Sequence, residues 1–261
     1  MKKRIISAVI ALVIMVPLII LGGIPFQISV LLIGAIAYKE MLDLKESHKE
    51  YPFIMSSIGA LLMFLLTLAN NRTFGLCWGI TYPIVGFIVI TLLIPIIFFK
   101  NDKYNSKDAL YLMGVVFFLG LSFNLFAVVR NLGLALFTWL ILIPMLNDIF
   151  AYLVGTKFGK TKMCTSISPH KTWEGSIGGL LGGSILSTVF YVIFIGPVTF
   201  RIIAYTILLS VVGQVGDLVL SKIKRENKIK DFSNLMPGHG GVLDRLDSVL
   251  FVFILYAILV F

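Results

Sequence analysis

The sequence has few charged residues and almost no cysteine for its length. Charged side chains make up 13% of its 261 residues, whereas soluble globular proteins carry about 25%. The hydrophobic share is 58%, and several charge-free runs approach or exceed the roughly 20 residues that a helix needs to cross a bilayer. The two cysteines, Cys77 and Cys164, fall on opposite sides of the membrane in the topology below, so no disulfide or cysteine-based metal site is expected. The composition excludes a soluble globular fold and predicts an all-α, polytopic integral membrane protein.

The N-terminus joins a basic start to an apolar run, which is also the pattern of a secretory signal peptide. No Ala-x-Ala-like cleavage site follows, and the apolar sequence resumes after Gly22-Gly23-Ile24-Pro25. The charge-free stretch 5–38 exceeds one bilayer thickness at 1.5 Å per residue. We therefore expect a helical hairpin that is divided at this Gly-Gly-x-Pro break.

Further apolar segments bring the expected total to about nine transmembrane helices. These segments are 52–69, 76–98, 109–129, 132–146, 176–196, 202–220 and 242–261. With a cytoplasmic N-terminus, all of the 22 Lys and Arg residues lie on the cytoplasmic side except Arg72, Arg130 and Arg201. One span more or fewer in mid-chain would destroy this asymmetry, so it supports both the number of spans and the orientation.

The formal net charge of +9 would suggest a nucleic-acid partner in a soluble protein. In a membrane protein, basic loops fix the orientation and contact anionic headgroups, so membrane lipids and no nucleic acid are expected as partners. The chain is interpreted as a single membrane domain, 1–261, whose character changes near Leu140. Helices with short loops make up 1–140, and 141–261 forms a catalytic half with long polar cytoplasmic loops.

The last cytoplasmic loop, 221–247, holds the densest set of reactive side chains. If the preceding helix continues into it, an acid, a hydroxyl and three cations share one helical face: Asp217, Ser221, Lys224, Arg225 and Lys228. Asp244 and Asp247 lie on the first turns of the last helix. The backbone of Gly240, Gly241 and this helix N-terminus is suited to an anion. The pattern is typical of a phosphate-and-metal site.

The loop before it, 147–179, begins near Asp148, at the expected cytoplasmic end of its helix. Asp148, Asp217 and Asp244 are therefore all expected at about the depth of the lipid phosphates. Unpaired acids are costly at this depth, so these residues should pair with cations or hold a metal. Carboxylates suit Mg²⁺, which takes one or two of them and completes its shell with water and phosphate oxygens.

Two features of this loop have simpler interpretations. The three lysines of 157–162 are interpreted as headgroup-binding residues on their charge alone. Gly175, Gly179 and Gly183, spaced by four, are interpreted as a helix-packing seam and not as a nucleotide loop, because small residues let spanning helices approach closely.

An ordered series of residues resembles the signature of the phosphatidate cytidylyltransferases. In chain order it reads Ser221-x-Ile223-Lys224-Arg225, Lys230-Asp231 and Pro237-x-His239-Gly240-Gly241-Val242-x-Asp244-Arg245-Leu246-Asp247. The preceding loop is similar to the same family at Gly155, Phe158-Gly159-Lys160, Ile167-Ser168-Pro169, Lys171-Thr172 and Glu174-Gly175. Together the motifs cover roughly 147–248. The chain departs from the family pattern at Met236, at Ile149-Phe150 and at His170.

The resemblance implies an enzyme of phospholipid biosynthesis in which a phosphate oxygen of phosphatidic acid attacks the α-phosphorus of CTP. The products would be CDP-diacylglycerol and pyrophosphate, and the implied cofactor is Mg²⁺. It further implies a multi-pass protein of the cell membrane with its active site on the cytoplasmic side, and a homodimer is compatible with it.

The resemblance also suggests, as a hypothesis, roles for the motif residues and for the acids Asp148 and Asp217 near them. The implied metal ligands are Asp217 and Asp244. The implied catalytic residues are three cations that neutralise substrate phosphates and three residues that order the loop or bind nucleotide: Lys224, Arg225, Arg245, Asp231, His239 and Asp247. The implied substrate-binding residues are Asp148, Ser168, Lys171, Ser221, Gly240 and Gly241.

Three other functions remain open on the residues alone. A CTP-using polyprenol or diacylglycerol kinase would share the phosphate site but would transfer the γ-phosphoryl group and release no pyrophosphate. A secondary transporter would carry ionisable residues midway along broken helices, whereas here they gather at one membrane face. A lipid-binding protein without catalysis would use the basic loops but would not need Asp217 and Asp244.

Overall fold

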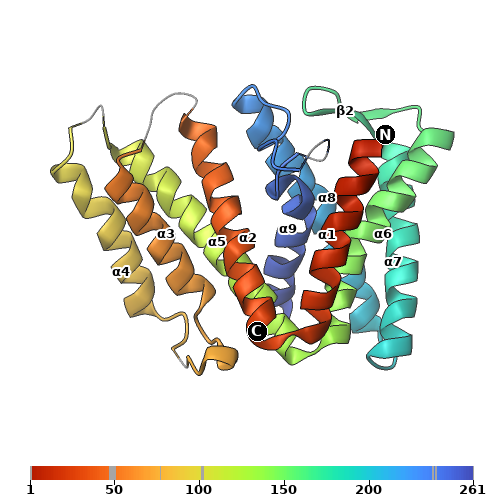
Figure 1. Ribbon diagram of the computed structural model, residues 1–261. Helices are drawn as coiled ribbons and strands as arrows, with labels where there is room; N and C mark the ends of the chain where they lie inside the picture. The colour runs from red at the N-terminus through yellow and green to blue at the C-terminus, as the bar shows by residue number, and fades with distance from the viewer. Residues whose placement is uncertain are drawn as a thin grey trace. The chain divides into compact units, whose positions relative to one another are not determined.

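The computed structural model describes residues 2–46, 51–76, 78–100, 103–236, 238 and 240–260, and most of them are helical (Figure 1). Contacts divide the chain into two compact units. The first unit combines Met1–Asn131 with Asp231–Asp244, and the second combines Leu132–Lys230 with Arg245–Phe261. The change of character expected near Leu140 thus falls within the second unit, and a short C-terminal segment belongs with the N-terminal helices.

The first unit contains helices α1 (Lys2–Leu21), α2 (Gly23–Glu46), α3 (Phe53–Thr67), α4 (Tyr82–Leu93) and α5 (Ser106–Leu132). Single 3₁₀ turns form at Arg72–Phe74 and Ile94–Ile97. Large apolar side chains from α2, α3 and α5 are fully buried in its core: Phe26, Met55, Met63, Leu66, Leu112 and Phe123.

The helical hairpin at the N-terminus is confirmed. Gly22 has a φ of 63°, a conformation that favours glycine, and it separates α1 from α2. The Arg130 side chain closes the end of α1, donating from Nε to the Ile19 carbonyl at 2.6 Å and from Nη2 to the Ile20 carbonyl at 2.9 Å. These are carbonyls that a helix C-terminus leaves without intrahelical partners, so Arg130 stabilises the turn.

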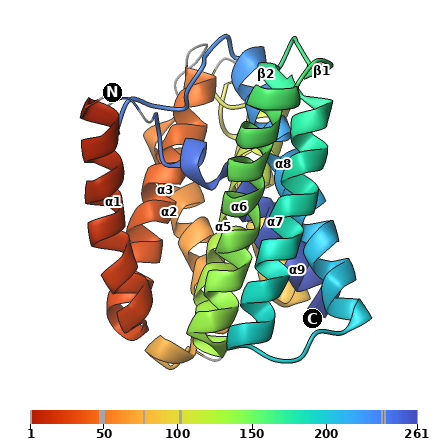
Figure 2. The same cartoon turned by 90° about the vertical axis from the view of Figure 1, so that its right-hand side faces the viewer.

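The second unit contains α6 (Leu134–Phe158), α7 (Trp173–Phe194), α8 (Phe200–Glu226) and all but the first two residues of α9 (Leu243–Val260). Strands β1 (Lys162–Cys164) and β2 (Ser168–Thr172) form an antiparallel hairpin. Figure 2 shows α6 and α7 side by side, with this hairpin at one end of the pair. The core between the helices is aromatic, and Trp139 packs edge-on against Tyr191 and Tyr256.

One expectation about the segment 147–179 was wrong. It was expected to be a loop, but α6 continues to Phe158 because nothing before Gly159 interrupts the helix. Of the rest, 162–172 contains the β hairpin and 173–179 begins α7, and the described fold is all-α apart from these two short strands. In the following loop, α8 ends at Glu226, and Lys228 has a φ of 57°. Lys228 therefore does not continue the face that carries Asp217.

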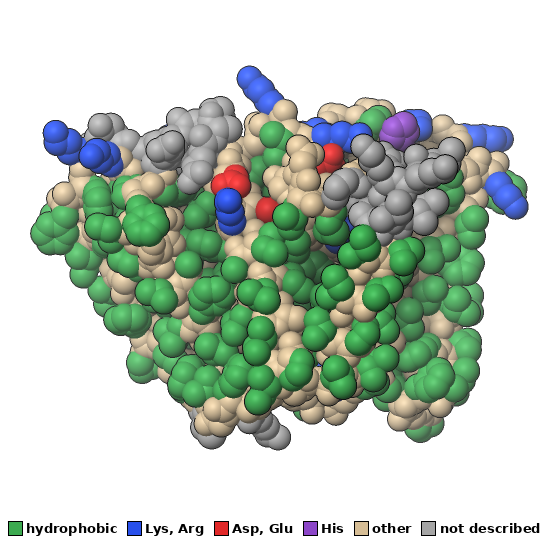
Figure 3. Space-filling view, viewed as in Figure 1, with side chains coloured by type: hydrophobic (Ala, Val, Ile, Leu, Met, Phe, Trp, Pro, Cys, Tyr) green, Lys and Arg blue, Asp and Glu red, His purple; other side chains and the backbone are tan. Residues whose placement is uncertain are grey.

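The described residues contain five helices that are long and apolar enough to cross a membrane: Gly23–Leu44, Ser106–Leu132, Leu134–Phe158, Trp173–Phe194 and Phe200–Glu226. Shorter apolar helices occur at Val9–Leu21, Phe53–Thr67 and Tyr82–Ile97. Figure 3 shows apolar side chains over much of the visible face of the molecule. These features support an all-α membrane protein, and the full count of nine spans stays a prediction.

Candidate active site

A buried polar network joins the three long helices of the second unit. Asn147 on α6 donates from Nδ2 to the Ser210 carbonyl of α8 at 3.1 Å. Gln214 on α8 donates from Nε2 to Asn147 Oδ1 at 2.8 Å and to the Ser176 carbonyl of α7 at 3.0 Å. The Ser176 hydroxyl donates in return to Gln214 Oε1. In apolar surroundings each of these groups would be costly if left unpaired, so the network fixes the relative register of α6, α7 and α8.

The glycine seam predicted from the sequence is confirmed by the packing of α7 on α6. A Cβ added at Gly175 would lie 2.8 Å from the Ala151 carbonyl oxygen, and one at Gly179 would lie 2.7 Å from the Asn147 carbonyl oxygen. At Gly183 it would lie 2.9 Å from the Asn147 backbone nitrogen. Hydrogen atoms in place of side chains therefore let the two backbones approach closely.

The atypical pair Ile149-Phe150 is explained by the same seam. A Cβ at Gly182 would lie 2.5 Å from the Phe150 ring, so this glycine accommodates the large side chain. Ile149 is 51% exposed. These two of the residues that differ from the family pattern are thus used for packing and for an exposed helix face, and neither lines the pocket described next.

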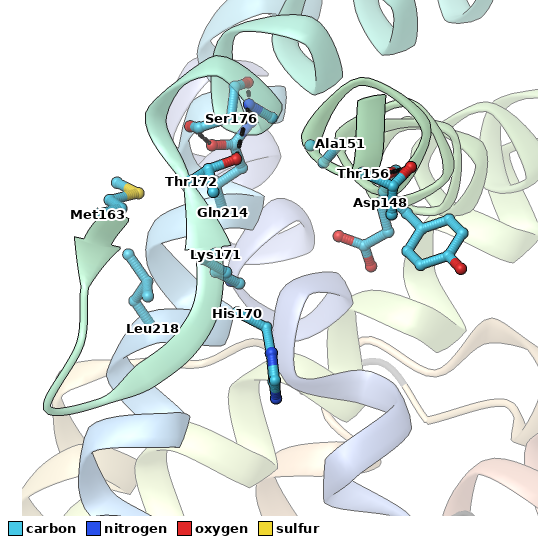
Figure 4. A pocket seen from close by; sticks show the side chains of 13 residues that line it. Asp148, Ala151, Thr156, Met163, His170, Lys171, Thr172, Ser176, Gln214 and Leu218 are labelled. Carbon is cyan, nitrogen blue, oxygen red and sulfur yellow. Dashed lines mark hydrogen bonds between the residues drawn. The ribbon is translucent and has the colours of Figure 1, made fainter. Parts of the chain in front are cut away.

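A pocket of about 390 Å³ lies among α6, the β hairpin, α7 and α8 of the second unit. Its lining is mainly apolar with a few polar groups: Asp148, Ala151, Tyr152, Gly155, Thr156, Met163, His170, Lys171, Thr172, Gly175, Ser176, Gln214 and Leu218. Figure 4 shows Asp148 on α6 across from the strand that carries Lys171 and His170. An apolar cavity with convergent polar groups is the usual form of a small-molecule site.

Asp217, an expected metal ligand, forms polar contacts with Lys171 and Ser221 in the second unit. Its Oδ2 forms an ion pair with Lys171 Nζ at 2.5 Å, and its Oδ1 accepts a hydrogen bond from the Ser221 hydroxyl at 3.1 Å. The side chains of Lys171 and Asp217 are 31% and 21% exposed, so both remain accessible. The structure therefore brings together three predicted site residues, from β2 and from two successive turns of α8.

Charges of both signs converge around this ion pair. The carboxylates of Asp148, Asp217 and Asp247 lie close enough for their negative charges to act on one another. The positive charges of Lys171 and Arg245 attract the carboxylate of Asp148, and the positive charge of Lys224 attracts that of Asp247. Lys224 is 7% exposed, which keeps a positive charge inside the unit. All six were predicted as site residues, and each belongs to the second unit.

Arg225 has a different environment from the other cations. It donates from Nε to the Ile167 carbonyl of the β1–β2 turn at 3.2 Å and from Nη1 to the Ile229 carbonyl at 2.9 Å. One planar guanidinium thus ties the end of α8 to the loop after it and to the β hairpin. Its predicted role in neutralising substrate phosphates stays a prediction, and this bridging role was not foreseen.

We expect Arg225→Lys to lower about tenfold the rate of the transfer reaction that the motif resemblance implies, because an ammonium keeps the charge but cannot reproduce the planar fork that reaches two carbonyls. Steady-state rates at saturating substrates measure this change. Lys222→Arg is the matched control, because Lys222 is more than half exposed and forms an exposed ion pair with Glu226 one turn further along α8. A rate for Arg225→Lys within twofold of wild type would mean that charge alone matters there.

The remaining predicted residues belong to the first unit or lie apart from the pocket. Asp244 Oδ2 accepts hydrogen bonds from the backbone N–H groups of Phe232 and Gly241, each at 2.8 Å. Gly241 was predicted to present its N–H to phosphate, and this N–H here donates to Asp244. Asp231 is exposed, Ser168 pairs with Cys164 in the β hairpin, and His239 lies outside the described residues.

Four residues that make buried polar contacts in the two units were not predicted from the sequence: Asn147, Ser176, Gln214 and Glu40. Asn147 precedes Asp148, and Gln214 lies one turn before Asp217 on the same face of α8, so their positions were a usable signal. Glu40 carried no such signal, because it belongs to no motif and is distant in sequence from the residues that it contacts.

Each of the two expected metal ligands, taken by itself, suits a magnesium ion in its chemistry. Among the residues that the structure describes, no group of three His, Cys, Asp or Glu side chains is placed to hold a metal. Mg²⁺ does not require such a group, since it commonly takes one or two carboxylates and fills its shell with water and substrate phosphate. Asp217 and Asp244, both carboxylates, are suitable ligands of this kind.

The fold and the pocket define a helical membrane protein with mixed charges suited to phosphate chemistry. The chain belongs to the cytidylyltransferase family, whose model matches residues 2–261. Phosphatidate cytidylyltransferase of Bacillus subtilis (strain 168) is 33% identical over 256 residues, which is 97% of this chain and 94% of that protein. Proteins of the same name are 34% identical in Staphylococcus haemolyticus and 32% identical in Staphylococcus aureus, each over 99% of this chain and 98% of theirs. The chain is therefore a nucleotidyltransferase.

Proposed function

We propose that this chain is a phosphatidate cytidylyltransferase, which transfers the cytidylyl group of CTP to phosphatidic acid and releases pyrophosphate. The observation that carries the proposal is that these relatives, which match this chain over nearly their whole length, are all named phosphatidate cytidylyltransferase. The mixed charges beside an apolar pocket support it further, because the acceptor has an anionic headgroup and apolar chains.

In the proposed reaction, an oxygen of the phosphatidate phosphate attacks the α-phosphorus of CTP. The new P–O bond forms as the bond to the β-phosphate bridging oxygen breaks, and pyrophosphate leaves. The attacking oxygen is already anionic near neutral pH, so no strong general base is needed. Positioning of the two phosphates and neutralisation of their charge supply most of the acceleration.

Each cation near the pocket has a place in this proposal. Lys171 on β2, paired with Asp217, lies in the pocket wall and is suited to the phosphate of the lipid acceptor. Arg245 lies close enough to Asp148, and Lys224 close enough to Asp247, for their opposite charges to attract one another, and both cations are suited to the phosphates of CTP. Asp148, His170 and the apolar lining then face the acceptor.

Asp217 and Asp244 are proposed as the carboxylate ligands of Mg²⁺. A bound Mg²⁺ would neutralise phosphate charge and orient the leaving pyrophosphate. The proposal rests on the oxygen donors of the two residues, on the place of Asp244 in a family motif and on the position of Asp217 one turn before Ser221 of that motif. The hydrogen bond from Ser221 and the contact with Lys171 orient Asp217, and two backbone N–H groups orient Asp244.

We further propose that the chain spans the bacterial plasma membrane nine times, with its N-terminus and active site in the cytoplasm. The support is the distribution of Lys and Arg, all but three of which fall on one side in this arrangement. The apolar helices and the bacterial sources of the relatives agree with such a location. A homodimer stays a prediction.

Purified protein in detergent, incubated with CTP labelled in the cytidine, phosphatidic acid and Mg²⁺, is expected to place the label in a lipid and release equimolar pyrophosphate. EDTA should abolish both products, and Mg²⁺ in excess should restore them. Label that enters no lipid would contradict the proposal. A phosphorylated lipid formed from γ-labelled CTP without pyrophosphate would identify a kinase instead.

A further inference from the structure

Glu40 is a buried acid in a helix that the family motifs do not include. It lies on α2, six residues before the end of the helix, and it is 3% exposed. A buried carboxylate is costly unless it accepts hydrogen bonds. Its partners therefore indicate what keeps it there.

Both carboxylate oxygens of Glu40 accept hydrogen bonds from the Asp231–Asp244 segment of the same unit. Oε1 accepts from the Ser233 hydroxyl at 2.7 Å and from the Val242 backbone N–H at 2.9 Å. Oε2 accepts from the Leu243 backbone N–H at 2.8 Å. Val242 lies 202 positions away in the chain, and Leu243 begins α9. Glu40 thus caps this helix in place of a local Ser, Thr or Asp, and the helix dipole favours its charge.

Asp244 binds the backbone N–H that directly precedes the two bound by Glu40. The N–H of Gly241 donates to Asp244 Oδ2, so three successive N–H groups, those of residues 241–243, are shared between two carboxylates. A Cβ at Gly240 would lie 2.7 Å from Asp244 Oδ2, and one at Gly241 would lie 2.8 Å from Glu40 Oε2. Gly240 and Gly241 are therefore required at these positions, because a side chain at either one would collide with the carboxylate of Asp244 or Glu40.

We propose that Glu40 is a positioning residue for the transferase reaction, which holds the first turn of α9 so that Asp244 presents its carboxylate in one direction. Glu40 does not touch the substrates in this proposal and acts through Asp244. The inference rests on the proposed role of Asp244 as a metal ligand. A neighbour that orients a metal ligand typically changes metal affinity or activity by 10- to 100-fold when it is removed.

The test compares Glu40→Gln with Asp43→Asn in the full-length protein. Gln has the size of Glu, but its NH₂ group cannot accept from a backbone N–H, so one of the two amides, those of Val242 and Leu243, loses its acceptor. Asp43 lies one turn further along α2 and is exposed, so its variant removes the same charge without the contact. Ser233→Ala removes only the hydroxyl donor and should have a smaller effect than Glu40→Gln.

Two readouts separate positioning from general stability. Hydrogen exchange, followed by mass spectrometry of peptides that cover 240–250, should be about tenfold faster at the first turn of α9 in Glu40→Gln, because a charge-assisted hydrogen bond is lost. The Mg²⁺ concentration for half-maximal activity should rise about tenfold. The KM for phosphatidic acid and the fraction of folded, monodisperse protein should stay within twofold of wild type. Asp43→Asn should match wild type in all four measurements.

Unchanged exchange in Glu40→Gln would overturn the proposal, and so would faster exchange with an unchanged Mg²⁺ requirement. A parallel loss of folded protein and of every kinetic parameter would assign Glu40 a purely structural role. Asp244→Asn separates this proposal from the metal assignment. An inactive Asp244→Asn beside a fully active Glu40→Gln refutes the Glu40 proposal alone, whereas an active Asp244→Asn refutes the metal assignment and with it the route through which Glu40 would act.

Discussion

Asp217→Asn is expected to lower the rate of CDP-diacylglycerol formation at least about 100-fold, because it removes a negative charge from the proposed Mg²⁺ site. Asn keeps the size of the side chain and one acceptor oxygen, so the hydrogen bond from Ser221 can persist. The ion pair with Lys171 is lost, which frees this lysine to move within the pocket wall. Rates of lipid labelling at saturating CTP and phosphatidic acid measure the effect.

Two further variants on α8 serve as controls for Asp217→Asn. Glu226→Gln removes the same charge from an exposed pair with Lys222, which spans 3.5 Å, and should change the rate by less than twofold. Ser221→Ala removes only the hydroxyl that donates to Asp217 and should lie between the two. If Asp217→Asn retained wild-type turnover, Asp217 would not be a metal ligand.

Gly179→Ala is expected to destabilise the second unit by about 1–3 kcal/mol and to lower activity with it. The added methyl group would lie 2.7 Å from the Asn147 carbonyl oxygen and 2.9 Å from the Ala151 side chain, so α6 and α7 must separate. Separation strains the hydrogen bond between Asn147 and Gln214, which sets the positions of Asp148 and Asp217. The thermal unfolding midpoint of the detergent-solubilised protein reports the loss of stability.

Gly114→Ala is the matched control, since it adds the same methyl group to a membrane helix at a position where a Cβ would meet no atom within 4 Å. Alanine also has the higher helix propensity, so this variant should be neutral or slightly more stable. Equal midpoints for the two variants would show that the seam tolerates a methyl group and that the close approach of α6 and α7 is not needed.

The helices were largely predictable because their signals are local. The break at Gly22 and the glycine seam of α7 were both read correctly from the sequence. The predictions were wrong where an apolar run gave way to polar sequence. Because Asn147 and Asp148 are polar, the segment after them was expected to be a loop, although no proline lies between Asp148 and Phe158 and α6 continues to Phe158. A polar face turned towards a pocket explains this composition better than a chain break does.

The sequence by itself determined that this protein is a helical membrane protein of the cytidylyltransferase family, because apolar length, helix breakers and an ordered motif are all properties of neighbouring residues. Only the tertiary structure decided which side chains meet. It paired Lys171 with Asp217, linked Asn147 to Gln214 and placed Glu40 beneath the start of α9. These contacts join residues 46 to 203 positions apart. No local pattern encodes them, because they depend on how whole helices pack and on the cost of leaving a buried polar group without a partner.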